Sequence, residues 1–306
     1  MRVIDSLTLG FNLAVGSLTA LALAVALDLL YWLGPRVVLG PAWLGLMTPQ
    51  LDSLPLEPAM LEGLRENVQT VANVHLLQSL SGALSLGGIA PVSVPSLLAS
   101  DPTLPGLGPT WELPSLGLAF ALFPLLLALG CLLGSVYLTL VARRVQGEPL
   151  ARPYLARWIL ATWGRVFALN LLILLLVVVG SVPLTLVVLV ASLLHPVLGS
   201  FVLAVASVVL LLVWVHGLFT LPAIVVERVN PLAAYWRSLL FVRRHFWAAL
   251  GLMGLAFVLN LGLGEVWRWL AETGLGTPVG MLGNAFVGTA LTAAILAFYR
   301  DRRTGQ

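Results

Sequence analysis

The chain is poor in charged residues. Only 9% of its 306 residues are charged, whereas 59% are hydrophobic. A soluble domain carries about a quarter charged residues, because a folded globule needs a surface that water can wet. This shortage excludes an ordinary water-soluble domain and predicts an integral membrane protein.

Residue types that commonly build reactive sites are also scarce. The single cysteine, Cys131, cannot form a disulfide within the chain, and the four histidines are scattered. No HExxH, GxSxG or GxxxxGK[ST] motif occurs in the sequence, so the usual signatures of zinc proteases, serine hydrolases and nucleotide-binding loops are missing. We therefore expect a protein that is not an enzyme and has no metal site and no cofactor.

Long apolar runs are what the sequence has in place of charge. A helix needs roughly 20 apolar residues to cross about 30 Å of hydrocarbon. The sequence predicts an all-α, polytopic membrane helix bundle, a single membrane domain with six transmembrane helices. The six expected spans are residues 7–33, 116–141, 166–194, 197–226, 246–263 and 279–299. The third and fourth spans come from one uncharged run, which His195-Pro196 and Gly199 are expected to break into a tight hairpin.

Arginine is distributed unevenly between the loops, and the chain contains no lysine. With the N-terminus inside, thirteen arginines fall in the inner segments and three in the outer ones. Because positive residues favour the cytoplasmic side of a membrane, we expect a multi-pass protein of a prokaryotic plasma membrane with both termini cytoplasmic.

Residues 34–115 form the expected extracytoplasmic segment. Within it, residues 56–80 have apolar side chains at helical spacing with acidic residues on other faces, which predicts an outer amphipathic helix. Residues 80–100 are apolar but interrupted by glycine and proline. A re-entrant loop and a seventh span both remain open for this stretch.

The segment from Leu221 to Leu250 combines charged and aromatic residues between two apolar spans. Asn230 is expected to cap a helix that begins at Pro231. Apolar residues on one side of this helix and arginines on the other predict an interfacial helix at the inner face, which then turns into the fifth span. We expect anionic lipid phosphates as partners of the cytoplasmic face, and the arginines expected to contact them are Arg157, Arg237, Arg243 and Arg244.

Polar residues within the spans are the other candidates for a site. Asp28 lies late in the first span, where it either packs the outer segment and reaches headgroups or forms a proton- or cation-linked site. His216 lies deeper, where it either joins helices by a hydrogen bond or acts as a titratable relay. Glu227, beside Arg228 and Arg237, is expected to form a local ion pair that fixes the inner loop.

The inner loop resembles that of a bacterial group of six-span membrane proteins. The group includes the YciC-like proteins and the membrane domain fused to some glycerophosphoryl diester phosphodiesterases. The shared pattern is Pro-Ala-hydrophobic-Glu at the exit of a span, then Pro and Ala, an Arg-Ser pair, and an aromatic pair at the next span. Its residues here are Pro222, Ala223, Glu227, Pro231, Ala234, Arg237, Ser238, Phe246 and Trp247. The first span and the outer VPSLLAS also resemble uncharacterised membrane proteins of Chloroflexi-type bacteria. The resemblance implies a six-span fold and assigns no activity.

These observations favour a non-enzymatic membrane scaffold or lipid-associated module. The alternative is a transporter or permease subunit, in which a water-lined cavity would reach Asp28 or His216. A lipid-modifying enzyme at Glu227 is a third hypothesis. A protein partner or a second copy of the chain also remains open, whereas nothing in the sequence points to nucleic acid.

Overall fold

The computed structural model describes residues 3–53, 58–78, 80, 93–100, 104, 106–148, 152–273 and 276–304. Helices form nearly all of these ranges, which confirms the all-α prediction. The long helices are α7 (Leu116–Gln146), α8 (Arg152–Leu194), α9 (Pro196–Gly217), α11 (Pro231–Ala271) and α12 (Gly276–Thr304). Among the described residues, five segments are long and apolar enough to cross a membrane, and a bent pair of helices near the N-terminus can supply a sixth. One of the five joins α9 to the short α10 (Thr220–Glu227).

The expected first span, residues 7–33, is a bent pair of helices. Residues 7–33 are not one straight helix, because α1 (Val3–Val15) and α2 (Leu18–Leu33) meet at an angle of 79°. Each is shorter than the roughly 20 residues that a crossing needs. Gly16 lies at the bend against the Arg144 guanidinium of α7, so closely that a Cβ at Gly16 would lie 2.6 Å from Arg144 Nη2. Glycine both weakens the helix here and makes room for the arginine.

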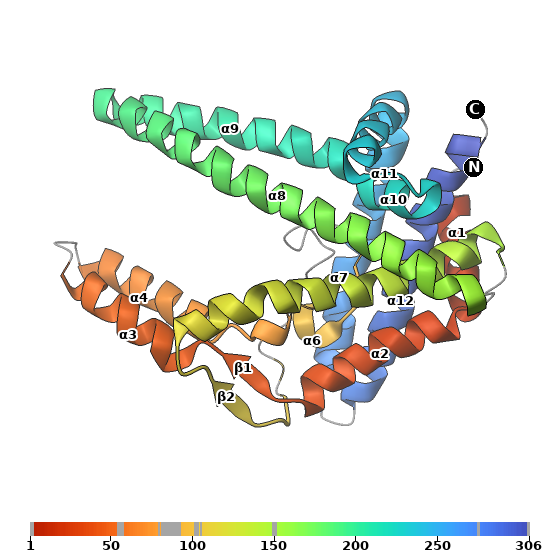
Figure 1. Cartoon of the computed structure of the whole chain (residues 1–306), viewed down its shortest axis with the longest axis horizontal. Coiled ribbons are helices and arrows are strands. Elements are labelled where there is room, and N and C mark those ends of the chain that lie inside the picture. Colours follow the sequence, from red (N-terminus) through yellow and green to blue (C-terminus); the bar gives the residue numbers. More distant parts are fainter. Residues whose placement is uncertain are drawn as a thin grey trace.

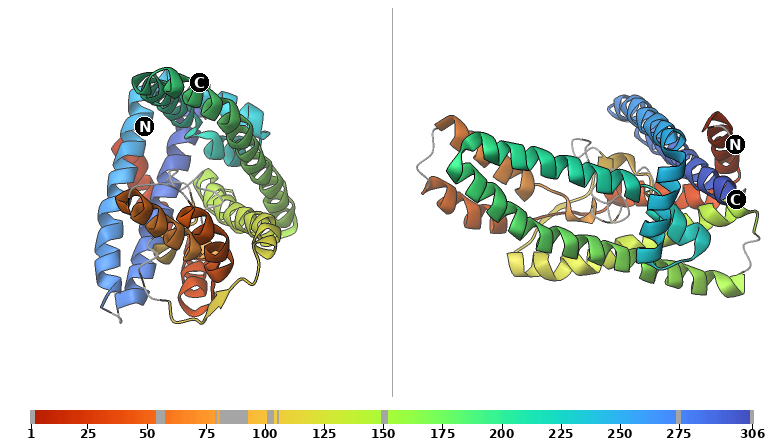
Figure 2. Two further views of the ribbon diagram at one scale, coloured as in Figure 1. Left: turned by 90° about the vertical axis from the view of Figure 1, so that its left-hand side faces the viewer. Right: turned by 90° about the horizontal axis from the view of Figure 1, so that it is seen from above.

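The hairpin between α8 and α9 is present where the sequence predicts it. α8 ends at Leu194, and the His195 ring caps α9 by accepting the Val197 N–H at 3.2 Å. α8 begins at Arg152, so the inner segment and the third expected span form one continuous helix. In Figures 1 and 2 this hairpin extends away from the rest of the molecule.

The side chains of the apolar length of the α8–α9 hairpin, residues 174–213, are largely exposed. Exposed valines and leucines occupy successive positions of both helices, including Leu175 to Val179 and Val208 to Val213. A helix that is apolar on every face needs an apolar environment, and water cannot supply one. The acyl chains of a lipid bilayer provide such an environment, so the protein is membrane-embedded.

Helix α12 is the most buried of the candidate spans and packs against α1, α2, α7, α10 and α11. Small residues of α1 allow the closest of these contacts. Gly10 faces Ala290 and Ala294 of α12, and a Cβ at Gly10 would lie 2.3 Å from the Ala290 carbonyl oxygen. Ser6 and Ala14, each four residues from Gly10, are also fully buried. This small-residue seam joins α1 to α12.

Helix α11 changes direction where an inner helix was expected to turn into the fifth span. Its backbone is non-helical at His245, with φ −125° and ψ 31°, so Pro231–Arg244 and the remainder of α11 are two helical parts. Figure 2 shows the bend between the parts. The long helices run in two main directions: α7, α8 and α9 follow the long axis of the molecule, and the second part of α11 runs beside α12 across it (Figures 1 and 2).

The expected extracytoplasmic segment contains more structure than the sequence indicates. Helix α4 (Pro58–Ala72) falls within the predicted amphipathic stretch, and α3 (Gly40–Asp52) packs beside it. A parallel pair of short strands, β1 (Arg36–Val38) and β2 (Thr110–Glu112), joins its two ends in the register Arg36 to Thr110. Two further short elements are η1 (Leu76–Gln78) and α6 (Leu97–Ser100). Most of the stretch 80–100, left open between a re-entrant loop and a seventh span, lies outside the described residues.

Candidate functional site

Helices from distant parts of the chain bring arginines together at one end of the molecule. The C-terminal ends of α7 and α12 meet the first turns of α8, the end of α10 and the start of α11, as Figure 1 shows. We call this region the arginine-rich end. Its described arginines are Arg143, Arg144, Arg157, Arg165, Arg228, Arg237, Arg300, Arg302 and Arg303.

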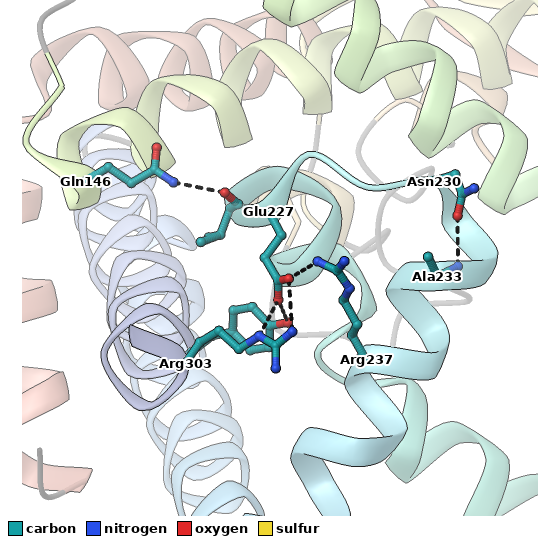
Figure 3. Close-up of polar contacts among 8 residues, drawn as sticks. Gln146, Glu227, Asn230, Ala233, Arg237 and Arg303 are labelled. Carbon is teal, nitrogen blue, oxygen red and sulfur yellow. Dashed lines mark hydrogen bonds and ion pairs between the residues drawn. The ribbon is translucent and has the colours of Figure 1, made fainter. Parts of the chain in front are cut away.

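Glu227 is the centre of a polar cluster at this end. Its side chain is only 12% exposed and accepts hydrogen bonds from the Arg237 guanidinium and the Tyr299 hydroxyl. Arg303 Nε lies 3.2 Å from Glu227 Oε1. Figure 3 shows Glu227 between Arg237 of α11 and Arg303 of α12. The carboxylate thus joins α10, α11 and α12, and the expected local pair with Arg237 is one part of a larger cluster.

Ser238, also from the inner-loop pattern, joins α11 to the break between α9 and α10. Its fully buried hydroxyl donates to the His216 carbonyl oxygen at 2.5 Å and accepts the Phe219 N–H at 3.1 Å. A break in a helix leaves backbone groups without intrahelical partners, and a buried group left in that state costs free energy. Serine suits this position because one small side chain satisfies both groups.

The prolines of the pattern, together with the expected cap Asn230, fix the ends of the helices. Asn230 accepts the Ala233 N–H at 2.9 Å, and Pro231 is the first residue of α11, as the sequence predicts (Figure 3). Pro222 lies in the first turn of α10, where its missing N–H costs no helical hydrogen bond. Arg228 ends α10 with a positive φ of 57°. These residues set the path of the loop that carries Glu227.

Arg228 pairs with a different carboxylate from the one expected. Its Nη2 lies 3.1 Å from Glu148 Oε2, and Arg143 Nε lies 3.7 Å from the same oxygen. Both guanidinium groups lie over the Trp158 ring, Arg143 at 4.1 Å and Arg228 at 4.4 Å from the ring centroid. Guanidinium groups are attracted to the face of an indole. The cluster therefore holds the start of α8 against the ends of α7 and α10.

The four arginines expected to meet phosphates have different environments. Arg243 and Arg244 are exposed immediately before the bend at His245, and Trp247, after the bend, is 81% exposed. Arg157 is exposed near Trp158 on α8. Arg237, by contrast, is held by Glu227. Arg237 therefore belongs to the Glu227 cluster, and the side chains of Arg157, Arg243 and Arg244 are exposed.

Asp28 and His216 occupy separate places. The fully buried Asp28 carboxylate accepts from Ser96 Oγ at 2.5 Å, the Leu97 N–H at 3.1 Å and the Leu98 N–H at 3.3 Å. It therefore caps α6 and anchors the outer segment to α2. His216 Nδ1 contacts the carbonyl oxygen of Leu212 within its own helix at 2.7 Å. Each side chain thus has a structural partner, and the described contacts do not bring the two together.

The sequence did not indicate that Arg143, Trp158 and Glu148 form one cluster. The signal in the sequence is spacing, since Thr139, Arg143 and Gln146 recur on one face of α7 and Arg157, Ala161 and Arg165 recur on one face of α8.

Within the described ranges, no group of three His, Cys, Asp or Glu side chains is placed to hold a metal ion. The arrangement can bind anions and fix helices. The chain matches no protein-family model, no curated protein and no solved structure.

Proposed function

We propose that this protein is a non-enzymatic scaffold of a prokaryotic plasma membrane, with both termini cytoplasmic, that holds anionic lipid headgroups at its inner face, where Arg243 and Arg244 lie. The observation that carries the proposal is the bend of α11. It places the exposed Arg243 and Arg244 directly before the exposed Phe246-Trp247 pair. Arginine meets headgroup phosphates and tryptophan prefers the same interfacial layer, so the two together suit a membrane boundary.

The unequal charge of the two sides supports this orientation. Thirteen of the sixteen arginines lie in segments assigned to the inner side, and eight of the thirteen acidic residues lie in segments assigned to the outer side. The inner-loop pattern, Pro222 to Trp247, builds the arginine-rich end through Glu227 and Ser238. This construction is consistent with the resemblance to YciC-like six-span proteins.

The test is lipid retention by the purified full-length chain. Protein carrying Arg243→Gln and Arg244→Gln, in nanodiscs of phosphatidylcholine with phosphatidylglycerol, should retain less phosphatidylglycerol in native mass spectrometry than the wild type. Arg65→Gln is the matched control, because Arg65 pairs with Asp52 in the outer segment. Equal retention by the double variant and the wild type would overturn the proposal.

A further inference from the structure

A cavity of about 300 Å³ lies at the arginine-rich end, between α7, α8 and the end of α10. Its lining includes four arginines, and no acidic side chain of the described residues lines it. The four are Arg143, Arg157, Arg165 and Arg228. We propose that this cavity binds the phosphate of an anionic lipid headgroup, an inference that rests on the proposed function and assigns it a specific site.

The charge balance of the cavity favours an anion. Arg143 and Arg228 share the carboxylate of Glu148, so one negative charge faces two positive ones. Arg157 and Arg165 have no acidic partner within the described ranges. Four guanidinium groups against one carboxylate leave three positive charges around the same space. Guanidinium groups donate paired hydrogen bonds that match the oxygens of a phosphate.

A buried hydroxyl gives independent evidence for a polar ligand. Thr139 lies on α7 one turn before Arg143, lines the cavity and is 5% exposed. Its Oγ1 has no hydrogen-bond partner in the described structure. Buried polar groups are nearly always satisfied, so an unpartnered one beside a cavity indicates a missing partner. A phosphate oxygen in the cavity can accept from this hydroxyl.

The position of the cavity favours a lipid over a soluble anion. Arg157 is exposed, and Arg165 lies two turns further along α8 and directly precedes the uncharged stretch 166–194. The side chains of that stretch are largely exposed and need lipid to cover them. A lipid whose phosphate is held between the four arginines would have its acyl chains beside this apolar surface. The Trp158 ring and Val225 add apolar lining that suits the glycerol part of a headgroup.

Retention of a single lipid by cavity variants tests this inference. The full-length protein is placed in nanodiscs of phosphatidylcholine containing a minor share of phosphatidylglycerol, and the retained phosphatidylglycerol is counted by native mass spectrometry. Arg157→Gln with Arg165→Gln should abolish the most tightly held phosphatidylglycerol, because each lost charged hydrogen bond weakens binding by about tenfold or more. Arg157→Lys with Arg165→Lys, which keeps the charge, should weaken binding less.

Thr139→Val is the substitution in the cavity that should disturb the fold least. It replaces an unpartnered buried hydroxyl by a methyl group of similar shape, so the free energy of unfolding of the lipid-free protein should be unchanged or higher. Binding of the tightly held lipid should fall by about tenfold, the value of one hydrogen bond to a charged group. A fall in binding without a fall in stability separates a ligand contact from a packing contact.

Inorganic phosphate distinguishes the two sources of the anion. The wild-type protein in nanodiscs of phosphatidylcholine alone is titrated with inorganic phosphate by calorimetry, and the same phosphate is added in competition with phosphatidylglycerol. Weak binding of phosphate beside strong retention of phosphatidylglycerol supports a lipid site. Phosphate binding that equals or displaces the lipid overturns the lipid assignment in favour of a soluble phosphate.

The surface variant separates this inference from the proposed function. Arg243→Gln with Arg244→Gln should lower the total amount of loosely held phosphatidylglycerol and leave the tightly held lipid in place. Unchanged tight retention in the Arg157 and Arg165 variant, with a normal response of the Arg243 and Arg244 variant, overturns the cavity site alone. No response to either change overturns both proposals.

Discussion

The hydroxyl of Ser238 donates a hydrogen bond to the carbonyl oxygen of His216 at 2.5 Å. The same hydroxyl accepts the N–H of Phe219, so one side chain of α11 satisfies both sides of the break between α9 and α10. Phe219 lies beneath this contact and packs against Phe241 and Tyr299, with ring centroids 4.8 and 6.0 Å away. Tyr299 in turn donates to Glu227. The break in the fourth apolar segment is therefore the point at which the arginine-rich end is fixed to the helices.

Ser238→Ala should destabilise the protein by about 1–3 kcal/mol for each backbone group left without a partner. The free energy of unfolding, measured by denaturant titration in detergent, provides the value. Ser207→Ala is the matched control, because the Ser207 hydroxyl is exposed and donates to Leu203 within its own helix. An equal effect of the two changes would show that the contact between α11 and the break contributes nothing.

Gly10→Ala should also destabilise the protein, although alanine is the better helix former. The added Cβ would meet the Ala290 carbonyl oxygen, which is backbone and cannot rotate away. Overpacking of this kind costs about 1–3 kcal/mol. Gly251→Ala is the control, since nothing lies within 4 Å of a Cβ at Gly251. Thermal unfolding in detergent should show a lower midpoint for Gly10→Ala and an unchanged or higher midpoint for the control.

The helices of this fold follow from apolar length and from the chemistry of the helix ends, both of which are local in sequence. His195-Pro196 and Asn230-Pro231 begin helices where predicted, because a capping side chain and a proline at the first position act within one turn. The bend between α1 and α2 was not predictable in the same way. Gly16 at this bend lies against Arg144 of α7, a contact between residues far apart in the sequence.

The candidate site was partly predictable for the same reason. Glu227 and Arg237 are ten residues apart, and their pairing was expected from one loop. Tyr299 and Arg303 complete the cluster from α12, more than seventy residues away. Arg228 likewise pairs with Glu148, eighty residues before it, in place of its neighbour Glu227. The choice of partner depends on how helices pack, which charge patterns in single loops do not specify.

Asp28→Asn should loosen the outer segment without unfolding the helices of the arginine-rich end. The carboxylate accepts three hydrogen bonds, from Ser96, Leu97 and Leu98. An asparagine side chain accepts only through its amide oxygen, so its NH2 group would face at least one of these three donors. Hydrogen exchange of the Leu97 and Leu98 amides should accelerate, by an amount that corresponds to about 1–3 kcal/mol. Asp52→Asn, at an exposed pair with Arg65, should leave both amides unchanged. Slow exchange in Asp28→Asn would contradict the capping role.

The outer segment should lose stability in mild acid through His75. Burial of the imidazole lowers its pKa from the ordinary 6.5, the nearby Arg36 lowers it further, and the Pro35 carbonyl contact opposes them. Because the folded form binds the proton less readily than the unfolded form, the contribution of His75 is complete above pH 6.5 and declines as the pH falls below that value toward the lowered pKa of the folded state.

Hydrogen exchange of the peptides around Pro35 and His75, corrected for intrinsic rates, measures this effect. Exchange should rise below the ordinary histidine pKa in the wild type and stay flat in His75→Gln, which can still donate to the Pro35 carbonyl oxygen but does not titrate. His195→Gln, at the exposed tip of the α8–α9 hairpin, should keep the wild-type acid response, because His195 lies far from this contact in the chain and faces solvent or lipid. The same acid response in His75→Gln would assign the loss of stability to another group.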